Sequence, residues 1–136
     1  MKNIILVVED KKSEQMIAKE IILGNGNKII IADALDKAES FIEQFSGKLS
    51  GIITDIHFPL TDGRSADEAN GVSVVLTALT HNIPCAVCTD DVAHGKQYIS
   101  LIVERLEKLV SQNIPVSSSK DWLESLQQLT KIIEVE

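Results

Sequence analysis

The sequence is poor in basic residues and in long apolar runs, and each shortage excludes a class of protein. Lys and Arg number 13 against 20 Asp and Glu, which gives a net charge of -7. Nucleic-acid interfaces and surfaces that bind anionic membranes need clustered basic side chains, so the charge argues against both partners. No apolar run approaches the roughly 20 residues that cross a bilayer, and the first ten residues lack a cleavage-site pattern. We therefore expect a cytoplasmic protein.

Cysteine is also scarce: the chain has only Cys85 and Cys88. Their spacing is that of redox and zinc motifs, but they lie in a short apolar run that is typical of a strand. Positions three apart on a strand face opposite sides, so the two thiols cannot converge on one metal or close easily into a disulfide. We expect two buried, reduced cysteines and hence a reducing compartment.

Aromatic residues make up 4% of the chain and hydrophobic residues 44%, so the core should consist mainly of Ile, Leu, Val and Ala. The length of 136 residues fits a single domain of ordinary size that spans residues 1–136. This amount of apolar side chain is enough to form a hydrophobic core.

Short apolar runs alternate with segments of helical periodicity along the whole chain. The apolar runs predict strands at 4–8, 28–32, 51–54, 84–88 and 114–116. The periodic segments predict helices at 13–23, 34–45, 72–79, 98–110 and 122–133. Strict alternation predicts an α/β fold, a doubly wound parallel sheet with helices on both faces and right-handed crossovers. Pro115 predicts that the last strand lies at a sheet edge.

The polar stretch Leu60–Asn70 predicts a long loop before the third helix. That helix has two candidate starts, one after Gly63 and one after Gly71. The extra residues fit a lid or a partner-contact loop, and they fit a tolerated surface insertion equally well.

Functional side chains follow the predicted strands at the ends where parallel α/β sheets bind ligands. These side chains are Glu9, Asp10, Asp55, Thr89 and Lys120. Carboxylates held close together repel one another, and a divalent cation relieves the repulsion. Oxygen ligands of this kind favour Mg²⁺ or Ca²⁺, and a partly hydrated Mg²⁺ is the usual solution. A carboxylate can also accept a phosphoryl group, whose oxygens a hydroxyl and a lysine would bind.

The chain resembles the receiver domain of two-component response regulators over nearly its whole length. The resemblance rests on Glu9-Asp10, on Asp55-Ile-His-Phe-Pro59 followed by Asp62-Gly63, on Thr89 and on Lys120, in the family's order. It implies a flavodoxin-like (βα)5 fold with strand order 2-1-3-4-5.

The resemblance also implies a role for each residue. Asp55 would accept a phosphoryl group from a phosphohistidine. Mg²⁺ would be held by Glu9, Asp10, Asp55 and the backbone carbonyl of His57, while Thr89 and Lys120 would contact the phosphoryl oxygens. The partners would be a sensor histidine kinase or a histidine phosphotransfer protein, together with a downstream protein. The chain would be a stand-alone receiver in a phosphorelay, a monomer or weak homodimer, with no enzymatic activity beyond phosphoryl acceptance and hydrolysis.

Several positions depart from the family pattern. Asp90 and Asp91 follow Thr89, where the family has a small residue, and Asp121 stands where a proline usually follows the lysine. Ser117 occupies the position of the aromatic residue that changes rotamer when a receiver is activated. The usual aromatic readout is therefore not expected in this chain.

Two other functions compete with a phosphorylated receiver. A pseudo-receiver, a binding module that works without phosphorylation, is favoured by Asp90, Ser117 and the missing proline. A hydrolase of the haloacid-dehalogenase type needs a second aspartate two residues after the nucleophile, where this chain has His57. We rank the hydrolase last for that reason.

Overall fold

The computed structural model describes residues 2–61, 69–90 and 98–135. Its sheet has five parallel strands in the order β2-β1-β3-β4-β5, as the resemblance implied. The strands are β1 (Ile4–Val8), β2 (Lys28–Ala32), β3 (Gly51–Thr54), β4 (Cys85–Cys88) and β5 (Val116–Ser117). The helices are α1 (Lys12–Gly24), α2 (Leu35–Phe45), α3 (Gly71–Thr80), α4 (Tyr98–Val110) and α5 (Trp122–Val135). The predicted α/β class and the doubly wound topology are confirmed.

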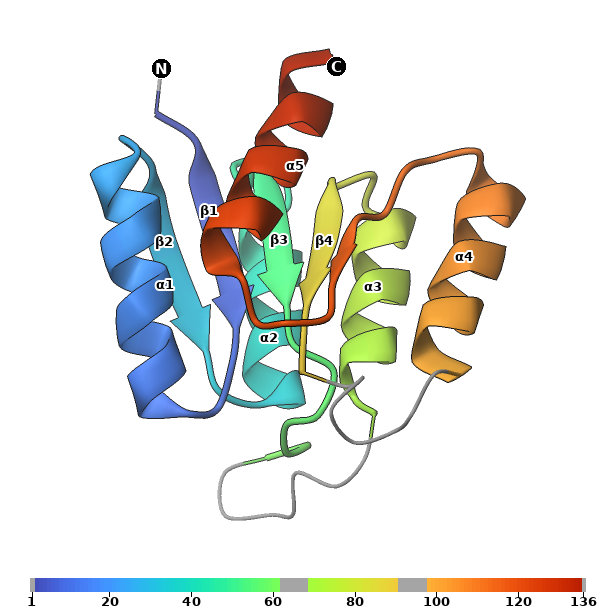
Figure 1. Ribbon diagram of the computed structural model, residues 1–136, viewed down its shortest axis with the longest axis horizontal. Helices are drawn as coiled ribbons and strands as arrows, with labels where there is room; N and C mark the ends of the chain where they lie inside the picture. The colour runs from blue at the N-terminus through green and yellow to red at the C-terminus, as the bar shows by residue number, and fades with distance from the viewer. Residues whose placement is uncertain (1, 62–68, 91–97, 136) are drawn as a thin grey trace.

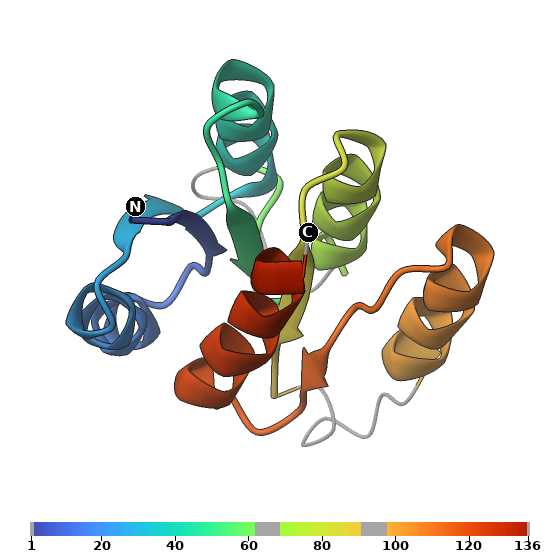
Figure 2. The ribbon, with the colours of Figure 1, turned by 90° about the horizontal axis from the view of Figure 1, so that it is seen from above.

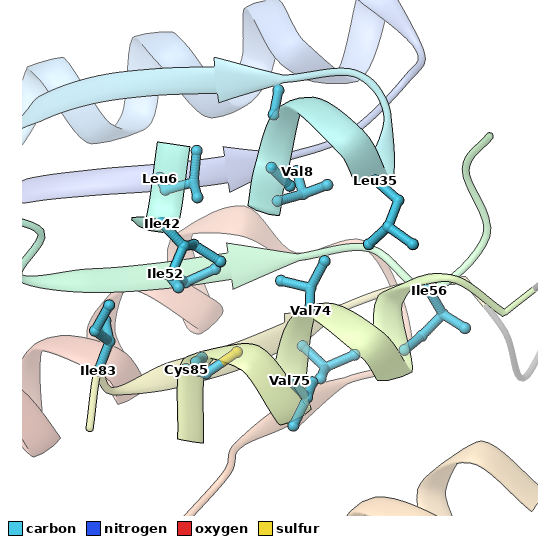
Figure 3. Close-up of a cluster of buried hydrophobic side chains, with 14 of the residues drawn as sticks. Leu6, Val8, Leu35, Ile42, Ile52, Ile56, Val74, Val75, Ile83 and Cys85 are labelled. Carbon is cyan, nitrogen blue, oxygen red and sulfur yellow. The ribbon is translucent and has the colours of Figure 1, made fainter. Parts of the chain in front are cut away.

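Helices cover both faces of the sheet (Figures 1 and 2). Helices α1 and α5 pack on one face, and α2 and α3 pack on the other, with α4 at the β5 side of the sheet. Side chains of each central strand alternate between the two layers, as a two-residue period requires. In β1, Leu6 and Val8 join the core under α2 and α3 (Figure 3), while Ile5 and Val7 join the core under α1 and α5.

The two cysteines obey the same alternation. Cys85 lies in the core with Val74 and Val75 of α3, and Cys88 lies in the core with Trp122 and Leu126 of α5. Both thiols are buried on opposite faces of β4, as predicted, and burial raises the pKa of each to about 12.

The fifth strand differs from its prediction. It comprises Val116–Ser117 rather than 114–116, and it begins only after Pro115. The carbonyl of Pro115 accepts a hydrogen bond from the Val87 N–H (2.8 Å), but proline has no N–H to extend the ladder. The predicted position of this strand at a sheet edge is confirmed.

Helix α4 packs less completely than its apolar stripe suggests. Val103 is buried, but Ile102 and Val110 are exposed and the side chain of Leu109 is 80% exposed. The edge strand β5 has two residues and offers little surface for the helix to cover.

The third helix uses the later of its two candidate starts, at Gly71. The Gly71 N–H donates to the Ile56 carbonyl (2.8 Å), and the Asn70 side-chain amide donates to the Phe58 carbonyl (2.7 Å). These two bonds hold the helix start against the segment that leaves β3. The other candidate start, most of the polar loop and residues 92–97 lie outside the described residues. Among the described helices, none is long and apolar enough to cross a bilayer.

Candidate functional site

The pairing of β1 with β3 sets Glu9 beside Asp55. Val8 is the register partner of Thr54, and the Asp55 N–H donates to the Val8 carbonyl (2.9 Å). Glu9 and Asp55 directly follow these paired residues, so both carboxylates emerge at the carboxyl end of the two central strands. This is the edge at which parallel sheets bind ligands.

Asp10 completes a cluster of three carboxylates. One ligand atom from each of Glu9, Asp10 and Asp55 lies within 4.8 Å of the other two. Glu9 is fully buried and Asp55 is 5% exposed, whereas Asp10 is half-buried. Two carboxylates of the cluster are therefore buried, and the third is partly exposed to solvent.

Glu9 is the most constrained member of the cluster. Its Oε2 atom accepts hydrogen bonds from the backbone N–H groups of Asp10 (2.9 Å) and Lys11 (3.3 Å). Burial, and then the negative charge of Asp55, raise the pKa of Glu9 from 4.5 to about 7 in spite of the nearby Lys120. Two negative charges this close to the core need a cation beside them.

Lys120 supplies one such cation from the far end of the chain. Its ammonium group pairs with the Oε1 atom of Glu9 and lies 2.8 Å from the Oδ2 atom of Asp55. Burial lowers the pKa of this lysine, but the charge of Asp55 and the hydrogen bonds to both carboxylates outweigh burial and raise it above its ordinary value. Lys120 is therefore a permanent positive charge between two acids.

The backbone at Lys120 is unusual. Its φ angle is +55°, in the left-handed region that costs a residue with a side chain roughly 1–2 kcal/mol. The Lys120 N–H donates to the Thr89 carbonyl (3.2 Å), which joins the start of α5 to the end of β4. Strained backbone of this kind concentrates at functional sites.

Thr89 is buried, with 2% of its surface exposed, directly after β4. Its N–H donates to the Ser117 carbonyl (2.9 Å), while its own carbonyl accepts from Lys120. Since β4 is the neighbour of β3, Thr89 emerges at the same edge of the sheet as Asp55.

The segment after Asp55 is fixed to the start of α2. The Asp55 Oδ1 atom accepts from the Ile56 N–H (2.7 Å), so the carboxylate is oriented by its own backbone. The N–H groups of Leu35 and Asp36, in the first turn of α2, donate to the carbonyls of Pro59 (2.9 Å) and Leu60 (3.0 Å). His57, half-buried, lies within this fixed segment.

The family departures at the start of α5 have structural explanations. Asp121 caps the helix, because its Oδ1 atom accepts from the Glu124 N–H (2.9 Å). Ser117 is 3% exposed, and its hydroxyl accepts from the Asp121 N–H (3.3 Å). No peptide bond of the described residues is cis. Asp90 is half-buried, while Asp62, Gly63, Asp91 and His94 lie outside the described residues.

Sequence reasoning missed a second layer of contacts around this cluster. The Trp122 indole N–H donates to the Glu14 Oε1 atom (2.9 Å), and the Gln15 side-chain amide donates to the Glu9 carbonyl (2.7 Å). The sequence pattern predicts only that Trp122 begins the last helix. Nothing in the local pattern indicated these bonds, since the indole and the Glu14 side chain are 108 positions apart.

The three carboxylates fit a hard divalent cation. They offer oxygen atoms only, they converge within 4.8 Å, and half-buried Asp10 leaves room for water ligands. Glu9 and Asp55 share their remaining charge with Lys120, which fits a site of modest affinity. In chemical terms, the arrangement combines three converging carboxylates with a fixed ammonium group.

Several solved structures have a similar fold. The receiver domain of HemR from Leptospira biflexa matches with a TM-score of 0.69 at 19% identity, over 99% of this chain and 97% of that one. The signal receiver domain of an HD domain-containing protein from Pseudomonas fluorescens matches with a TM-score of 0.70 at 14% identity, over 100% of both chains. No model of a known protein family matches the sequence, and no curated protein is significantly similar to it.

The low identities restrict what these matches show. A de novo designed protein of Rossmann 2x3 fold also matches, with a TM-score of 0.62 at 10% identity over 96% of this chain. That protein shares the architecture alone, and a fold by itself does not establish a function. Together, the whole-length matches and the strand order show that this chain has the fold of response regulator receiver domains.

Proposed function

We propose that the protein is a response regulator receiver that accepts a phosphoryl group on Asp55 in a Mg²⁺-dependent phosphorelay and signals by binding another protein. One observation carries the proposal. The Lys120 ammonium contacts the carboxylates of Glu9 and Asp55, and Asp10 lies within the same 4.8 Å cluster. This combination is what aspartyl phosphorylation requires, and the receiver fold supports it.

The residues divide the chemistry between them. Mg²⁺, when bound, would offset the charge of the incoming phosphoryl group, and Glu9, Asp10, Asp55 and the His57 carbonyl would hold it. An Asp55 carboxylate oxygen forms a bond to phosphorus as the bond to the donor histidine nitrogen breaks. The electron pair of that bond remains on the donor imidazole.

Two further residues would bind the transferred group. Lys120 places a positive charge 2.8 Å from the Asp55 carboxylate, where the phosphoryl oxygens arrive. Thr89 would donate its hydroxyl to another of these oxygens. The two residues lie side by side, because the Lys120 N–H donates to the Thr89 carbonyl.

The partners follow from this chemistry. The phosphoryl donor would be a sensor histidine kinase or a histidine phosphotransfer protein, and the output would be contact with a downstream protein. We propose a cytoplasmic monomer or weak homodimer that acts on no substrate other than its own phosphoryl group. The net charge of -7 supports the exclusion of nucleic acid as a partner.

Acetyl phosphate provides the direct test. The protein is incubated with acetyl phosphate and Mg²⁺ and its intact mass is recorded, with Asp55→Asn and a Mg²⁺-free sample as controls. We expect a single phosphoryl adduct that requires Mg²⁺ and is absent from the variant. If the folded wild-type protein gains no adduct, phosphorylation of Asp55 is refuted.

A pseudo-receiver is the second candidate, favoured by Asp90, Ser117 and Asp121 and disfavoured by the presence of Asp55, Thr89 and Lys120. The Lys120 ammonium offsets one of the negative charges of Glu9 and Asp55, so part of the repulsion in the cluster is relieved without a metal. Such a module would bind its partner whether or not Asp55 is modified. Absence of both the adduct and any Mg²⁺-dependent change in melting temperature would favour this function over the first.

A further inference from the structure

A closed ring of contacts surrounds the ammonium group of Lys120. The ammonium lies 5.7 Å from the centre of the Trp122 ring, and the Trp122 indole donates to Glu14. The next residue on α1, Gln15, donates to the Glu9 carbonyl, and Glu9 contacts the ammonium. The first turn of α1 is thus joined to the carboxylate cluster by two routes.

Trp122 is well suited to hold a charge in place. It is 1% exposed and belongs to the core under α1 and α5, so its ring cannot move freely. A cation near an indole face is attracted by the ring, and the attraction increases when water is excluded. The hydrogen bond to Glu14 fixes the remaining rotation of the ring.

Lys120 needs such support. It extends from a left-handed backbone position outside regular structure, directly before the capping residue of α5. Its ammonium group contacts the carboxylates of Glu9 and Asp55 and lies near the Trp122 ring.

The support comes from helix α5 and not from the residue at position 117. Ser117 stands where receivers carry the aromatic residue, and it is buried with its hydroxyl on the Asp121 N–H. The aromatic side chain near the site therefore lies on α5 and is bonded to α1. A change at the site would consequently reach the first turn of α1.

We propose that Trp122 and Glu14 form a positioning pair that holds the Lys120 ammonium at Asp55 and couples the site to the first turn of α1. Neither residue touches the phosphoryl group, so both act through Lys120. The catalytic part of this inference rests on the proposed phosphorylation of Asp55, whereas the coupling of Lys120 to α1 does not.

The first experiment measures the rate of Mg²⁺-dependent phosphorylation by acetyl phosphate in Trp122→Phe, Glu14→Ala and Glu14→Gln. Trp122→Phe keeps a ring but loses the N–H, and Glu14→Ala removes its acceptor. We expect each to lower the rate about fivefold. The Mg²⁺ concentration at half-maximal rate should not change, because the three carboxylates remain. Glu14→Gln keeps an acceptor oxygen and should restore most of the rate.

The double variant separates a positioning pair from two unrelated structural effects. If Trp122 and Glu14 act as a unit, the double variant Trp122→Phe/Glu14→Ala should be phosphorylated at about the same rate as each single variant. Wild-type rates in both single variants, or losses that multiply in the double variant, would overturn the proposal. Melting temperatures of all variants confirm that each is folded at the assay temperature.

The second experiment needs neither phosphate nor metal. Trp122 is the only tryptophan of the chain, so its emission reports the ring directly. We expect Lys120→Met to change that emission and to accelerate amide exchange in the first turn of α1 about fivefold. Lys131→Met, an exposed lysine on the same helix, should change neither quantity.

The two experiments distinguish failure of the proposed function from failure of the coupling between Lys120 and α1. If the wild-type protein takes up no phosphoryl group but Lys120→Met alters Trp122 and α1, the coupling stands and the proposed function falls. If Lys120→Met leaves emission and exchange unchanged, the coupling is wrong whatever the phosphorylation result.

Discussion

Replacing Gly71 with alanine should destabilise the fold more than the same change at Gly51 or Gly24. A Cβ atom at this position would lie 2.1 Å from the Asp55 carbonyl oxygen and 2.6 Å from the Ile56 Cα atom. Both neighbours are backbone atoms of the segment that leaves β3. They cannot rotate away as a side chain would, so either α3 or the Asp55 segment has to move.

The loss in the free energy of unfolding depends on how far the backbone must shift to relieve this clash. Carbon–oxygen contacts between non-bonded groups are normally about 3.3 Å or longer, so relief requires a shift of roughly 1 Å. Such a shift would also break or lengthen the bond from the Gly71 N–H to the Ile56 carbonyl, now 2.8 Å. Overpacking of this kind costs about 1–3 kcal/mol, and loss of a buried hydrogen bond adds about 1 kcal/mol. We expect a loss of about 3 kcal/mol in the free energy of unfolding.

Urea unfolding followed by Trp122 fluorescence and circular dichroism measures this loss, and two other glycines provide a scale. At Gly51 the added Cβ would meet the Leu129 Cδ2 atom at 2.8 Å, a flexible side chain, so we expect a smaller cost of about 1–2 kcal/mol. At Gly24, the last residue of α1, no atom lies within 4 Å, so alanine should be neutral or stabilise by up to about 1 kcal/mol.

The decisive result is the order of the three variants in their free energy of unfolding. A Gly71→Ala protein within about 0.5 kcal/mol of wild type would refute the reasoning, because it would mean that α3 does not approach Asp55 as described. A larger loss at Gly51 than at Gly71 would refute it equally. If the order holds, the folded Gly71→Ala protein should also be phosphorylated more slowly, since its Asp55 backbone is displaced.

The remaining predictions concern the site and the core. The pKa of Glu9 is raised from 4.5 to about 7 in the folded state, so its contribution to stability is present below pH 4.5 and is lost as the pH rises through 7. Urea titrations should therefore show a loss of up to about 3 kcal/mol over this range that Glu9→Gln abolishes; an identical slope in the variant would contradict the assignment. Mg²⁺ at about 100 times its dissociation constant should stabilise the wild-type protein by roughly 2.7 kcal/mol at pH 7. Asp10→Asn should weaken this effect in thermal melts, and an equal Mg²⁺ shift in both proteins would place the cation elsewhere. Cys85 and Cys88 should react with a thiol reagent only on unfolding, because burial raises the pKa of each to about 12. Rapid labelling in native buffer, without loss of circular dichroism, would disagree with the described core.

The fold was predictable because its signals are local. Runs such as Ile4–Val8 read as strands buried on both faces, and their alternation with periodic segments leaves few arrangements other than a doubly wound sheet. The spacing of Cys85 and Cys88 correctly placed them on opposite faces. The error at the fifth strand occurred where the local signal is weak, because β5 has only two residues.

The candidate site was predictable in part for a similar reason. Strands that run in parallel present their carboxyl ends at one edge, so Glu9, Asp10 and Asp55 had to emerge there once the strand order was given. Three-dimensional structure was needed to show that their oxygen atoms converge within 4.8 Å.

By itself, therefore, the sequence determined the strands, the helices and the set of residues at one edge of the sheet, since these depend on periodicity and on neighbours along the chain. Only the tertiary structure decided which of those residues touch. The Lys120 contact with Glu9 spans 111 positions and depends on a left-handed backbone angle, and the Trp122 contact with Glu14 spans 108. The approach of Gly71 to the Asp55 backbone depends on how α3 packs against β3. Contacts between distant segments are set by the packing of whole elements, and no local pattern records that packing.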